Sequence, residues 1–520
     1  MKKGKVFRSI TVFVKKNKKE LILLGLILIV GAFFRLYEIS AYMTFLGDEG
    51  RDVIIVRRIF TELHPPLIGP GTSVGGMYLG PLYYYLMAIP LLVAGFSPVG
   101  PAVMVALIGI ITILFVWWAG REWFGKAAGI IAALLYAISP TVIIYSRSSW
   151  NPNIMPFFAL LSIYSIWKVW ALKKFNWLII LGLSLAFVLQ SHYLGLLLIP
   201  TIFVFWVLTL KNLKLAGNLK VEIKRFWQKT LVGLGLFLTL MSPLLIFDIR
   251  HDFINANAMY KFLMERQNVV TFDFFQMFSN IPKTIQLITG SLMAGKSDLP
   301  TTVISLVVAA GVAFVIVGGV FFRKKIKIKK EHWLVISWFA FGVLGLSLYK
   351  QSIYDHYFGF LFPAPFLIMG MIISKFVNGK ILLKLIGGAL LICLVYLNLK
   401  ASPLRKDPNR LLGRSMNVSK VIEENSDGKP FNLAVIADTN YEDGYKYFLL
   451  KDKYPVIDID SQKPETITDQ LFVVCELHPS SKCDPTHSPK AQVANFGWSE
   501  IENIWEVDGA TVYKLVHSGD

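Results

Sequence analysis

Long apolar runs, separated by short stretches rich in Lys and Arg, fill the first 400 residues of the chain. A helix that crosses the bilayer needs about 20 mostly apolar residues, and twelve runs are candidates. They lie near residues 20–37, 80–96, 99–119, 127–146, 153–171, 176–191, 193–210, 230–247, 301–322, 332–349, 358–374 and 380–398. The pattern therefore predicts an α-helical protein that crosses the membrane many times.

The basic stretches predict the topology, because Lys and Arg near the ends of spans stay on the cytoplasmic side. They lie at residues 2–19, 121–126, 173–174, 211–229, 323–330 and 375–384. If all twelve runs crossed, the stretches at 121–126 and 173–174 would lie on the opposite side from the later ones. The run at 80–96 is broken by Pro90 and begins with three tyrosines, which favour the membrane interface. We interpret it as an interfacial helix.

About eleven spans then remain, and every basic stretch lies in the cytoplasm. This topology divides the chain into a basic cytoplasmic N-terminus at 1–19, a membrane domain at 20–400 and a soluble domain at 401–520. The loops at 38–98 and 248–300 and the soluble domain are predicted to be external. We expect the protein to reside in the cell membrane.

Composition supports the membrane class and argues against nucleic acid as a partner. Of 520 residues, 54% are hydrophobic and 17% charged, with a mean hydropathy of +0.55. The net charge of +19 is carried by the membrane part, because residues 401–520 hold 13 Lys and Arg and 19 Asp and Glu. The positive charge lies between hydrophobic runs, with no nucleic-acid-binding motif beside it.

The pattern of residues 401–520 predicts a small α/β domain. Strands are expected at 432–437, 470–476 and 510–516, and a helix at 441–450. Cys475 and Cys483 are eight positions apart in this external domain, so a disulfide between them is permitted but not required. We find no catalytic motif in this domain.

An acidic pair, Asp48–Glu49, opens the external loop that follows the first span. The next residues form an amphipathic stretch, which predicts a helix lying on the bilayer with Val53, Val56, Phe60 and Leu63 on one face. A structural interpretation is that Asp48 caps this helix, because aspartate is a preferred N-cap residue. A functional interpretation is that the pair takes part in catalysis at the membrane surface.

The order of several short motifs carries a family resemblance. After the first span come Asp48–Glu49, Pro-Leu-Tyr-Tyr at 81–84, Gly-Arg-Glu-Trp-Phe-Gly at 120–125, Ser139-Pro140, Tyr145-Ser146-Arg147 and Trp150-Asn151-Pro152-Asn153. Together they resemble the GT-C membrane glycosyltransferases, in particular the group of protein O-mannosyltransferases and lipid A aminoarabinose transferases. The resemblance covers roughly residues 20–400, and its specific motifs lie in the first 160.

The resemblance implies an inverting glycosyltransferase that moves a sugar from a polyprenyl-phosphate donor to an external acceptor, which is a glycan, a lipid or a protein. Asp48 matches the catalytic carboxylate of the family and is expected to act as general base. Glu49 would orient the acceptor or help to hold Asp48. No metal cofactor is predicted, because Asn151 and Asn153 stand where relatives often carry an acid.

The donor phosphate needs a cation, and here the sequence departs from its relatives. The aminoarabinose transferases use a lysine before the Pro-Leu-Tyr segment, whereas residues 74–81 contain none. Arginine suits phosphate because its fork donates hydrogen bonds in parallel. The candidate substrate-binding residues at the external face are Tyr78, Arg147, Asn153, His192, Arg250, His356 and Tyr357. Arg250 could instead pair with Asp248 or Asp252, Arg147 could be an interfacial anchor, and the histidines could be hydrogen-bonded wall residues.

Two other classes of function stay open from the sequence. A polytopic transporter of a lipid-linked or polysaccharide substrate would share the spans, although the chain carries no ionisable residue near the middle of a span, where many transporters place one. A membrane receptor or assembly factor would use the soluble domain and would not need Asp48.

Overall fold

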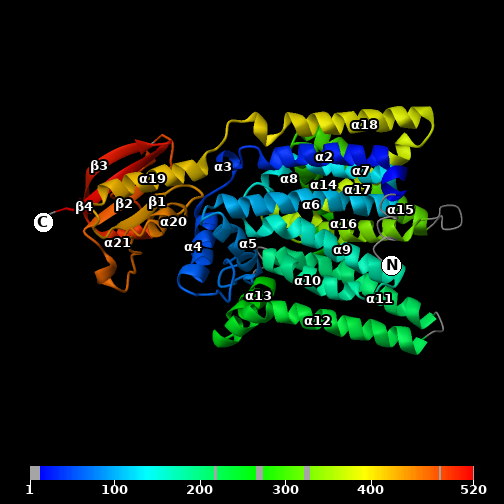
Figure 1. Ribbon diagram of the computed structural model, residues 1–520, viewed down its shortest axis with the longest axis horizontal. Helices are drawn as coiled ribbons and strands as arrows, with labels where there is room; N and C mark the ends of the chain where they lie inside the picture. The colour runs from blue at the N-terminus through cyan, green and yellow to red at the C-terminus, as the bar shows by residue number, and fades with distance from the viewer. Residues whose placement is uncertain (1–11, 216–218, 265–272, 321–327, 480–481, 519–520) are drawn as a thin grey trace.

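The computed structural model describes residues 12–215, 219–264, 273–320, 328–479 and 482–518. A bundle of long helices forms one part, and a small domain with a four-stranded sheet lies at one end of that bundle (Figure 1). The bundle contains α2 (Lys18–Leu36), α6 (Val99–Phe124), α7 (Lys126–Ile138), α9 (Met155–Leu172), α10 (Trp177–Ser191), α11 (Ile199–Leu215), α12 (Leu219–Arg250), α15 (Asp298–Val320), α16 (Lys330–Ser347), α17 (Pro363–Val377) and α18 (Ile381–Lys400).

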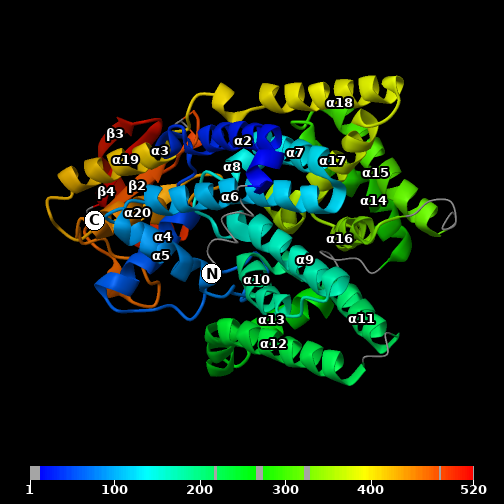
Figure 2. The same ribbon diagram turned by 45° about the vertical axis from the view of Figure 1, so that its right-hand side comes forward.

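Shorter elements connect these helices. They are α3 (Ile39–Tyr42), α4 (Gly47–Thr61), α5 (Leu82–Val93), α8 (Pro140–Ile144), η1 (Asn151–Ile154), η2 (Tyr193–Leu198), α13 (Ile254–Met264), α14 (Phe274–Met293), η3 (Asp355–Leu361) and η4 (Pro403–Arg405). The views in Figures 1 and 2 agree that α4 and α5 lie where the bundle meets the sheet domain.

The predicted loop at 248–300 is helical over much of its described length, because it contains α13 and α14.

The bundle is built for a lipid environment. Six helices of the described chain are long and apolar enough to cross a membrane, and a seventh span is possible across η3 and α17, which meet at 59°. Large apolar side chains such as Ile29, Phe203 and Ile392 are exposed on the outer helices, where only lipid can cover them. The protein is thus a multi-pass membrane protein, and the count of eleven spans stays a prediction.

The predicted interfacial helix at 80–96 has the expected dimensions. α5 has 12 residues, or about 18 Å at the rise of an α-helix, against about 30 Å of hydrocarbon. Length alone does not settle the topology, since α7 and α10 are also apolar helices of fewer than 18 residues.

Ion pairs bring the basic segments together at the end of the bundle that is far from the sheet domain (Figure 1). Arg121 Nε lies 2.6 Å from Glu20 Oε1 at the start of α2, and Lys168 Nζ lies 2.7 Å from Glu122 Oε1. Lys173 and Glu222 join the next two segments at 3.2 Å. Charged residues from four segments therefore share one end of the bundle.

The sheet domain has the strand order β1-β2-β4-β3, with β1 and β2 parallel and the other two pairs antiparallel. Its elements are α19 (Leu411–Asn425), β1 (Asn432–Ile436), α20 (Asp443–Lys451), η5 (Pro464–Thr466), β2 (Gln470–Cys475), α21 (Ala491–Phe496), β3 (Ser499–Val507) and β4 (Ala510–His517). α19 and α20 pack on one face of the sheet and α21 packs on the other. The predicted strands β1, β2 and β4 and the predicted helix α20 are confirmed.

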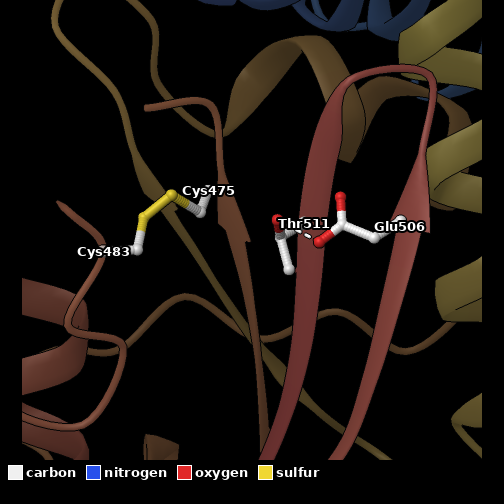
Figure 3. The surroundings of a disulfide bond; sticks show 4 residues. All are labelled: Cys475, Cys483, Glu506 and Thr511. Atoms are coloured by element: carbon white, nitrogen blue, oxygen red, sulfur yellow. Dashed lines mark hydrogen bonds between the residues drawn. A yellow bond between two sulfur atoms is a disulfide. The ribbon is translucent and has the colours of Figure 1, made fainter. Parts of the chain in front are cut away.

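A disulfide joins Cys475, the last residue of β2, to Cys483 (Figure 3). Beside it, Thr511 Oγ1 on β4 donates a 2.8 Å hydrogen bond to Glu506 Oε1 on β3. The disulfide ties the segment that follows β2 to the centre of the sheet.

Candidate active site

Asp48 lies in the first turn of α4 but does not cap it. The N-cap residue is Leu46, whose N–H donates a 3.0 Å hydrogen bond to Glu49 Oε2, one half of a capping box. Asp48 Oδ1 instead accepts hydrogen bonds from Arg51 Nη1 at 2.8 Å and from the Tyr441 hydroxyl at 2.7 Å. The interpretation of Asp48 as an N-cap is therefore wrong, and Glu49 does the capping.

The start of α4 fits into a turn of the sheet domain. Asn440 Oδ1 accepts a 2.8 Å hydrogen bond from Gly47 N. A Cβ at Gly47 would lie 2.4 Å from the Tyr441 ring, and one at Gly50 would lie 2.3 Å from the backbone of Asp443. Glycine at both positions lets the two segments approach, so the Gly-Asp-Glu-Gly sequence allows this contact.

The sequence predicted that the apolar face of α4 lies on the bilayer. In the structure this face is covered by protein instead. Val53 and Val56 are buried in a cluster that also contains Tyr447 and Phe448 of α20. Leu63, predicted on the same face, follows the end of the helix and is 84% exposed. α4 is therefore held between α5 and the sheet domain, which fixes the direction of Asp48.

Arg51 links Asp48 to a buried second carboxylate. Its guanidinium donates to Asp48 and, through Nε and Nη2, to Asp52 Oδ1 at 3.1 and 2.8 Å. Tyr84 donates a 2.9 Å hydrogen bond to the same Asp52 oxygen. Burial raises the pKa of Asp52 to about 6, against the opposing effect of Arg51.

Each of the three tyrosines predicted at the membrane interface forms a hydrogen bond with another segment of the protein. Tyr84 bonds to Asp52, the Tyr83 hydroxyl lies 2.7 Å from Ser149 Oγ, and Tyr85 donates to Pro66 O at 2.6 Å. Tyr83 and Tyr84 are buried. They hold α5 against α4 and the segment after α8, and they line neither of the cavities described next.

Two cavities meet at Asp48. The first, called the loop cavity, has a volume of about 190 Å³ and is lined by Asp48, Arg51, Pro70, Gly71, Thr72, Ser73, Leu79, Trp150, Asn151, Pro152, His192, Tyr193, His356 and Tyr357. The second, called the domain cavity, has about 250 Å³ and is lined by Thr44, Leu46, Asp48, Glu49, Ile144, Tyr145, Ser148, Trp150, Thr439 and Tyr441. Asp48 and Trp150 line both cavities, so a molecule in either one meets the same carboxylate.

Five of the predicted site residues gather at these cavities. Asp48, His192, His356 and Tyr357 line the loop cavity, and Glu49 lines the domain cavity. The His356 ring lies 4.6 Å from the Trp150 ring, and the His192 ring lies 5.2 Å from the Tyr357 ring. Burial lowers the pKa of His192 to about 3, so its imidazole is neutral at physiological pH.

The other four predicted residues lie outside both cavities. The buried Arg147 guanidinium donates to the carbonyls of Phe34 and Tyr37 at the end of α2, so it joins two segments of the protein and is not an anchor at the membrane interface. Asn153 Nδ2 donates to Ser148 O at 2.8 Å inside the protein.

Arg250 and Tyr78 also lie apart from Asp48. Arg250 is the last residue of α12 and is exposed, while Asp248 accepts the backbone N–H groups of Asn255 and Ala256. Tyr78 packs on Phe247 at 5.6 Å, and its N–H donates to Asn255 Oδ1 at 2.6 Å. The structure does not bring the expected phosphate ligand Arg250 to the site.

The glycine-rich segment after α4 forms the wall of the loop cavity. Thr72 N donates to Met77 O at 2.8 Å and Leu79 N donates to Pro70 O at 3.0 Å, which closes a hairpin. Gly75 and Gly76 at its tip have φ of 75° and 65°, a conformation that favours glycine. The segment covers the cavity with backbone and small side chains.

Sequence reasoning missed Arg51, Trp150 and Tyr441. Trp150 was noticed only as part of a motif, and Arg51 was given no role. Tyr441 comes from a domain in which we saw no catalytic motif, and its contact with Asp48 joins residues 393 positions apart. The two glycines around Asp48–Glu49 were the one local sign of a close partner.

No group of three or more His, Cys, Asp or Glu side chains that could hold a metal occurs in the described part of the chain. The absence of a metal requirement stays a prediction.

Comparison with known proteins connects this geometry to a fold. The family model described as dolichyl-phosphate-mannose-protein mannosyltransferase matches residues 79–247. A search among curated proteins finds no match. The structure is similar to that of ArnT from Cupriavidus metallidurans bound to undecaprenyl phosphate, with a TM-score of 0.61 and 12% identity over 96% of this chain and 98% of that one. The chain has a GT-C glycosyltransferase fold.

The oligosaccharyltransferase AglB from Archaeoglobus fulgidus, in complex with an inhibitory peptide and a dolichol-phosphate, is also similar. Its TM-score is 0.51 with 12% identity, over 89% of this chain and 70% of that one. The match over residues 79–247 and the fold support a membrane glycosyltransferase related to the O-mannosyltransferases and ArnT. The family match begins after the Asp48–Glu49 pair, so it does not test the roles of these two residues.

Proposed function

We propose that this GT-C enzyme transfers a sugar from a polyprenyl-phosphate donor to an acceptor on the external side, with inversion at the anomeric carbon and Asp48 as general base. The carrying observation is that Asp48 lines both cavities, so it can meet a donor in one and an acceptor in the other. The comparison proteins support a lipid donor, since ArnT was solved with undecaprenyl phosphate and AglB with a dolichol-phosphate.

The chemistry is a direct displacement. The acceptor oxygen forms a bond to the anomeric carbon, and its proton passes to the Asp48 carboxylate. The bond from that carbon to the phosphate oxygen breaks, and its electron pair leaves with the polyprenyl phosphate. A single displacement with one base inverts the anomeric centre.

Arg51 is the cation that we propose for the donor phosphate, in place of Arg250. Among the residues that line the loop cavity, it is the one Lys or Arg side chain. A guanidinium has five N–H donors, and four are used by Asp48, Asp52 and Tyr441. The Arg51 side chain is partly exposed and lines the cavity, so its positive charge can attract a phosphate oxygen placed there. His192, being neutral, contributes hydrogen bonding without charge.

The orientation follows from the distribution of charge. Four of the six basic segments share the end of the bundle opposite Asp48 and the sheet domain, and basic segments stay cytoplasmic. The Cys475–Cys483 disulfide fits an oxidising compartment outside the cytoplasm. We therefore place the site outside, where nucleotide sugars are absent and a lipid-linked donor is required.

Replacement of Asp48 by asparagine tests the proposal. The side chain keeps its shape but loses the basic oxygen, and loss of a positioned base costs about 10²- to 10⁴-fold in rate. The Asp48 side chain is 42% exposed, so loss of its ion pair with Arg51 should lower the free energy of unfolding by at most about 1 kcal/mol. The measurement is transfer from radiolabelled polyprenyl-phosphate sugars in membranes.

Glu62→Gln, at the exposed far end of α4, is the matched control because it removes a carboxylate from the same helix. It should transfer sugar at the wild-type rate. Full transfer by the Asp48→Asn protein would remove Asp48 from the mechanism.

A further inference from the structure

The walls of the domain cavity hold two carboxyl groups and no basic side chain. Its ten lining residues include the carboxyl groups of Asp48 and Glu49, and none of them is Lys, Arg or His. The loop cavity is also lined by Asp48, but Arg51 adds a positive charge there. Its two histidines, His192 and His356, add none at neutral pH, because burial lowers their pKa to about 3 and about 4. A phosphate group in the domain cavity would face Asp48 and Glu49 without a cation from the wall. An uncharged acceptor avoids this repulsion.

The remaining walls combine flat rings with hydroxyl groups. Tyr145, Trp150 and Tyr441 supply three aromatic rings, all of them partly exposed. Thr44, Ser148 and Thr439 supply three hydroxyls, each able to donate and to accept a hydrogen bond. A sugar ring has matching surfaces, because its C–H faces are apolar and its rim carries hydroxyls.

The form of the cavity argues against an extended peptide. Peptides are commonly recognised along sheet edges or in long grooves. Here the sheet domain contributes only Thr439 and Tyr441, from the turn between β1 and α20, and no strand. The volume of about 250 Å³ is smaller than the roughly 300–1,000 Å³ of pockets for drug-sized ligands, so it suits one small residue.

We propose that the domain cavity binds the uncharged sugar end of a glycan, whose hydroxyl is the acceptor beside Asp48. This inference rests on the proposed function and narrows its acceptor class. The sheet domain forms one wall of the acceptor site through Thr439 and Tyr441, while the donor occupies the loop cavity.

The bond that forms distinguishes this acceptor from others. Transfer to a sugar hydroxyl gives a glycosidic acetal, with the hydroxyl proton passing to Asp48 and polyprenyl phosphate leaving. Transfer to a phosphate would give a glycosyl phosphate, which mild acid splits. Transfer to Ser or Thr would give a product that a protease reduces to small peptides.

The first test identifies the product class. Membranes with the full-length wild-type chain or the Asp48→Asn chain are supplied with a panel of radiolabelled polyprenyl-phosphate hexoses, and the unused donor is removed. The expected result is a label that needs Asp48 and that remains linked to another sugar after mild acid and after protease. An Asp48-dependent label that mild acid releases as the free monosaccharide, or that protease leaves linked directly to Ser or Thr of small peptides, overturns the acceptor class and leaves the proposed function standing. If no donor gives an Asp48-dependent label, the proposed function fails and this inference with it.

The second test asks which cavity binds the donor and which binds the acceptor. A tryptophan side chain is introduced at the wall of each cavity in turn, so that it blocks that cavity. Thr439→Trp should raise the KM for the glycan acceptor about tenfold or more, with little change in donor KM, and Ser73→Trp should do the reverse. Both positions are exposed, so neither change disturbs a core. Ser461→Trp, at an exposed serine of the sheet domain outside both cavities, is the matched control and should change neither KM. A rise in donor KM alone for Thr439→Trp would overturn the assignment.

Discussion

The two cavities on either side of Asp48 share a carboxylate and an indole but differ in origin and charge. The loop cavity is built from the membrane part of the chain, between the hairpin at 70–79 and the turns around His192 and His356. The domain cavity is closed by Thr439 and Tyr441 of the sheet domain. Arg51 and two histidines line the first, whereas acidic and uncharged groups line the second.

This difference suggests a division of labour under the proposed function. A phosphate-bearing donor is drawn to the cavity that has a cation, and an uncharged acceptor fits the one that has none. Because the two walls belong to separate parts of the chain, the acceptor side could change in evolution through the sheet domain while the donor side stayed the same.

The largest effect that would sharpen the comparison is expected at Arg51. Loss of its charge-assisted bond to the donor phosphate, about 1.5 to 3 kcal/mol, should raise the donor KM about 10- to 100-fold and leave the acceptor KM nearly unchanged. The measurement is initial transfer rate against donor concentration, with Arg250→Ala as the matched arginine control outside both cavities.

Arg51→Ala alone would leave the fully buried Asp52 without its ion pair, which can unfold the protein. The double change Arg51→Ala with Asp52→Asn removes that charge as well and keeps the test interpretable. A large donor effect in Arg250→Ala, with normal donor use by the double variant, would contradict the assignment of the phosphate to the loop cavity.

A smaller effect is expected where the sheet domain touches the shared carboxylate. Tyr441→Phe removes the hydroxyl that donates to Asp48 Oδ1 and keeps the ring against Gly47. The lost hydrogen bond of about 1 kcal/mol should lower kcat about fivefold, with donor KM and thermal stability almost unchanged. Tyr454→Phe, in the same domain but outside both cavities, should have no effect on kcat. Equal rates for wild type and Tyr441→Phe would mean that the sheet domain does not position Asp48.

Sequence patterns predicted the parts of this molecule that depend on local chemistry. Apolar length predicted the bundle, and an acidic pair after a span drew attention to Asp48 and Glu49. Both residues line cavities, and their catalytic roles stay a prediction. In the sheet domain, buried runs such as Gln470–Cys475 were found because all their residues are apolar or buried. β3 was missed because it is largely exposed and its Ile501 and Ile504 do not alternate with a polar face.

The missing parts of the site depend on contacts between distant segments. Arg250 was proposed because it is an arginine on the predicted external face, but only the fold shows that Arg51 is the arginine that lines a cavity beside Asp48. Tyr441 carried no local sign, since its role comes from the docking of α4 into the turn before α20. A glycine on each side of an acidic pair could have been taken as evidence for such docking.

The smallest effect concerns Glu49, which belongs to the domain cavity alone. Burial raises its pKa from the ordinary 4.5 to about 7 in the folded protein. A carboxyl group with a raised pKa contributes stability that is complete below pH 4.5 and is lost as the pH rises to about 7. Asp52 acts in the same direction, but its pKa of about 6 means that Glu49 contributes most of the change between pH 6 and 7.

Between pH 6 and 7, Glu49 should lower the free energy of unfolding of the wild-type protein by about 1 kcal/mol per pH unit. The Glu49→Gln protein should not show this decrease. The glutamine oxygen can still accept the Leu46 N–H, so the helix start is kept. The measurement is apparent Tm of the purified protein in lipid nanodiscs from pH 5 to 8, with Glu62→Gln as the exposed control. The Glu49→Gln curve should gain on the wild-type curve as the pH rises and run parallel to it above pH 8, because Glu49 is then fully charged in both the folded and the unfolded chain. Parallel curves over the whole range would show that Glu49 titrates normally, and the domain cavity would then hold two full negative charges at neutral pH.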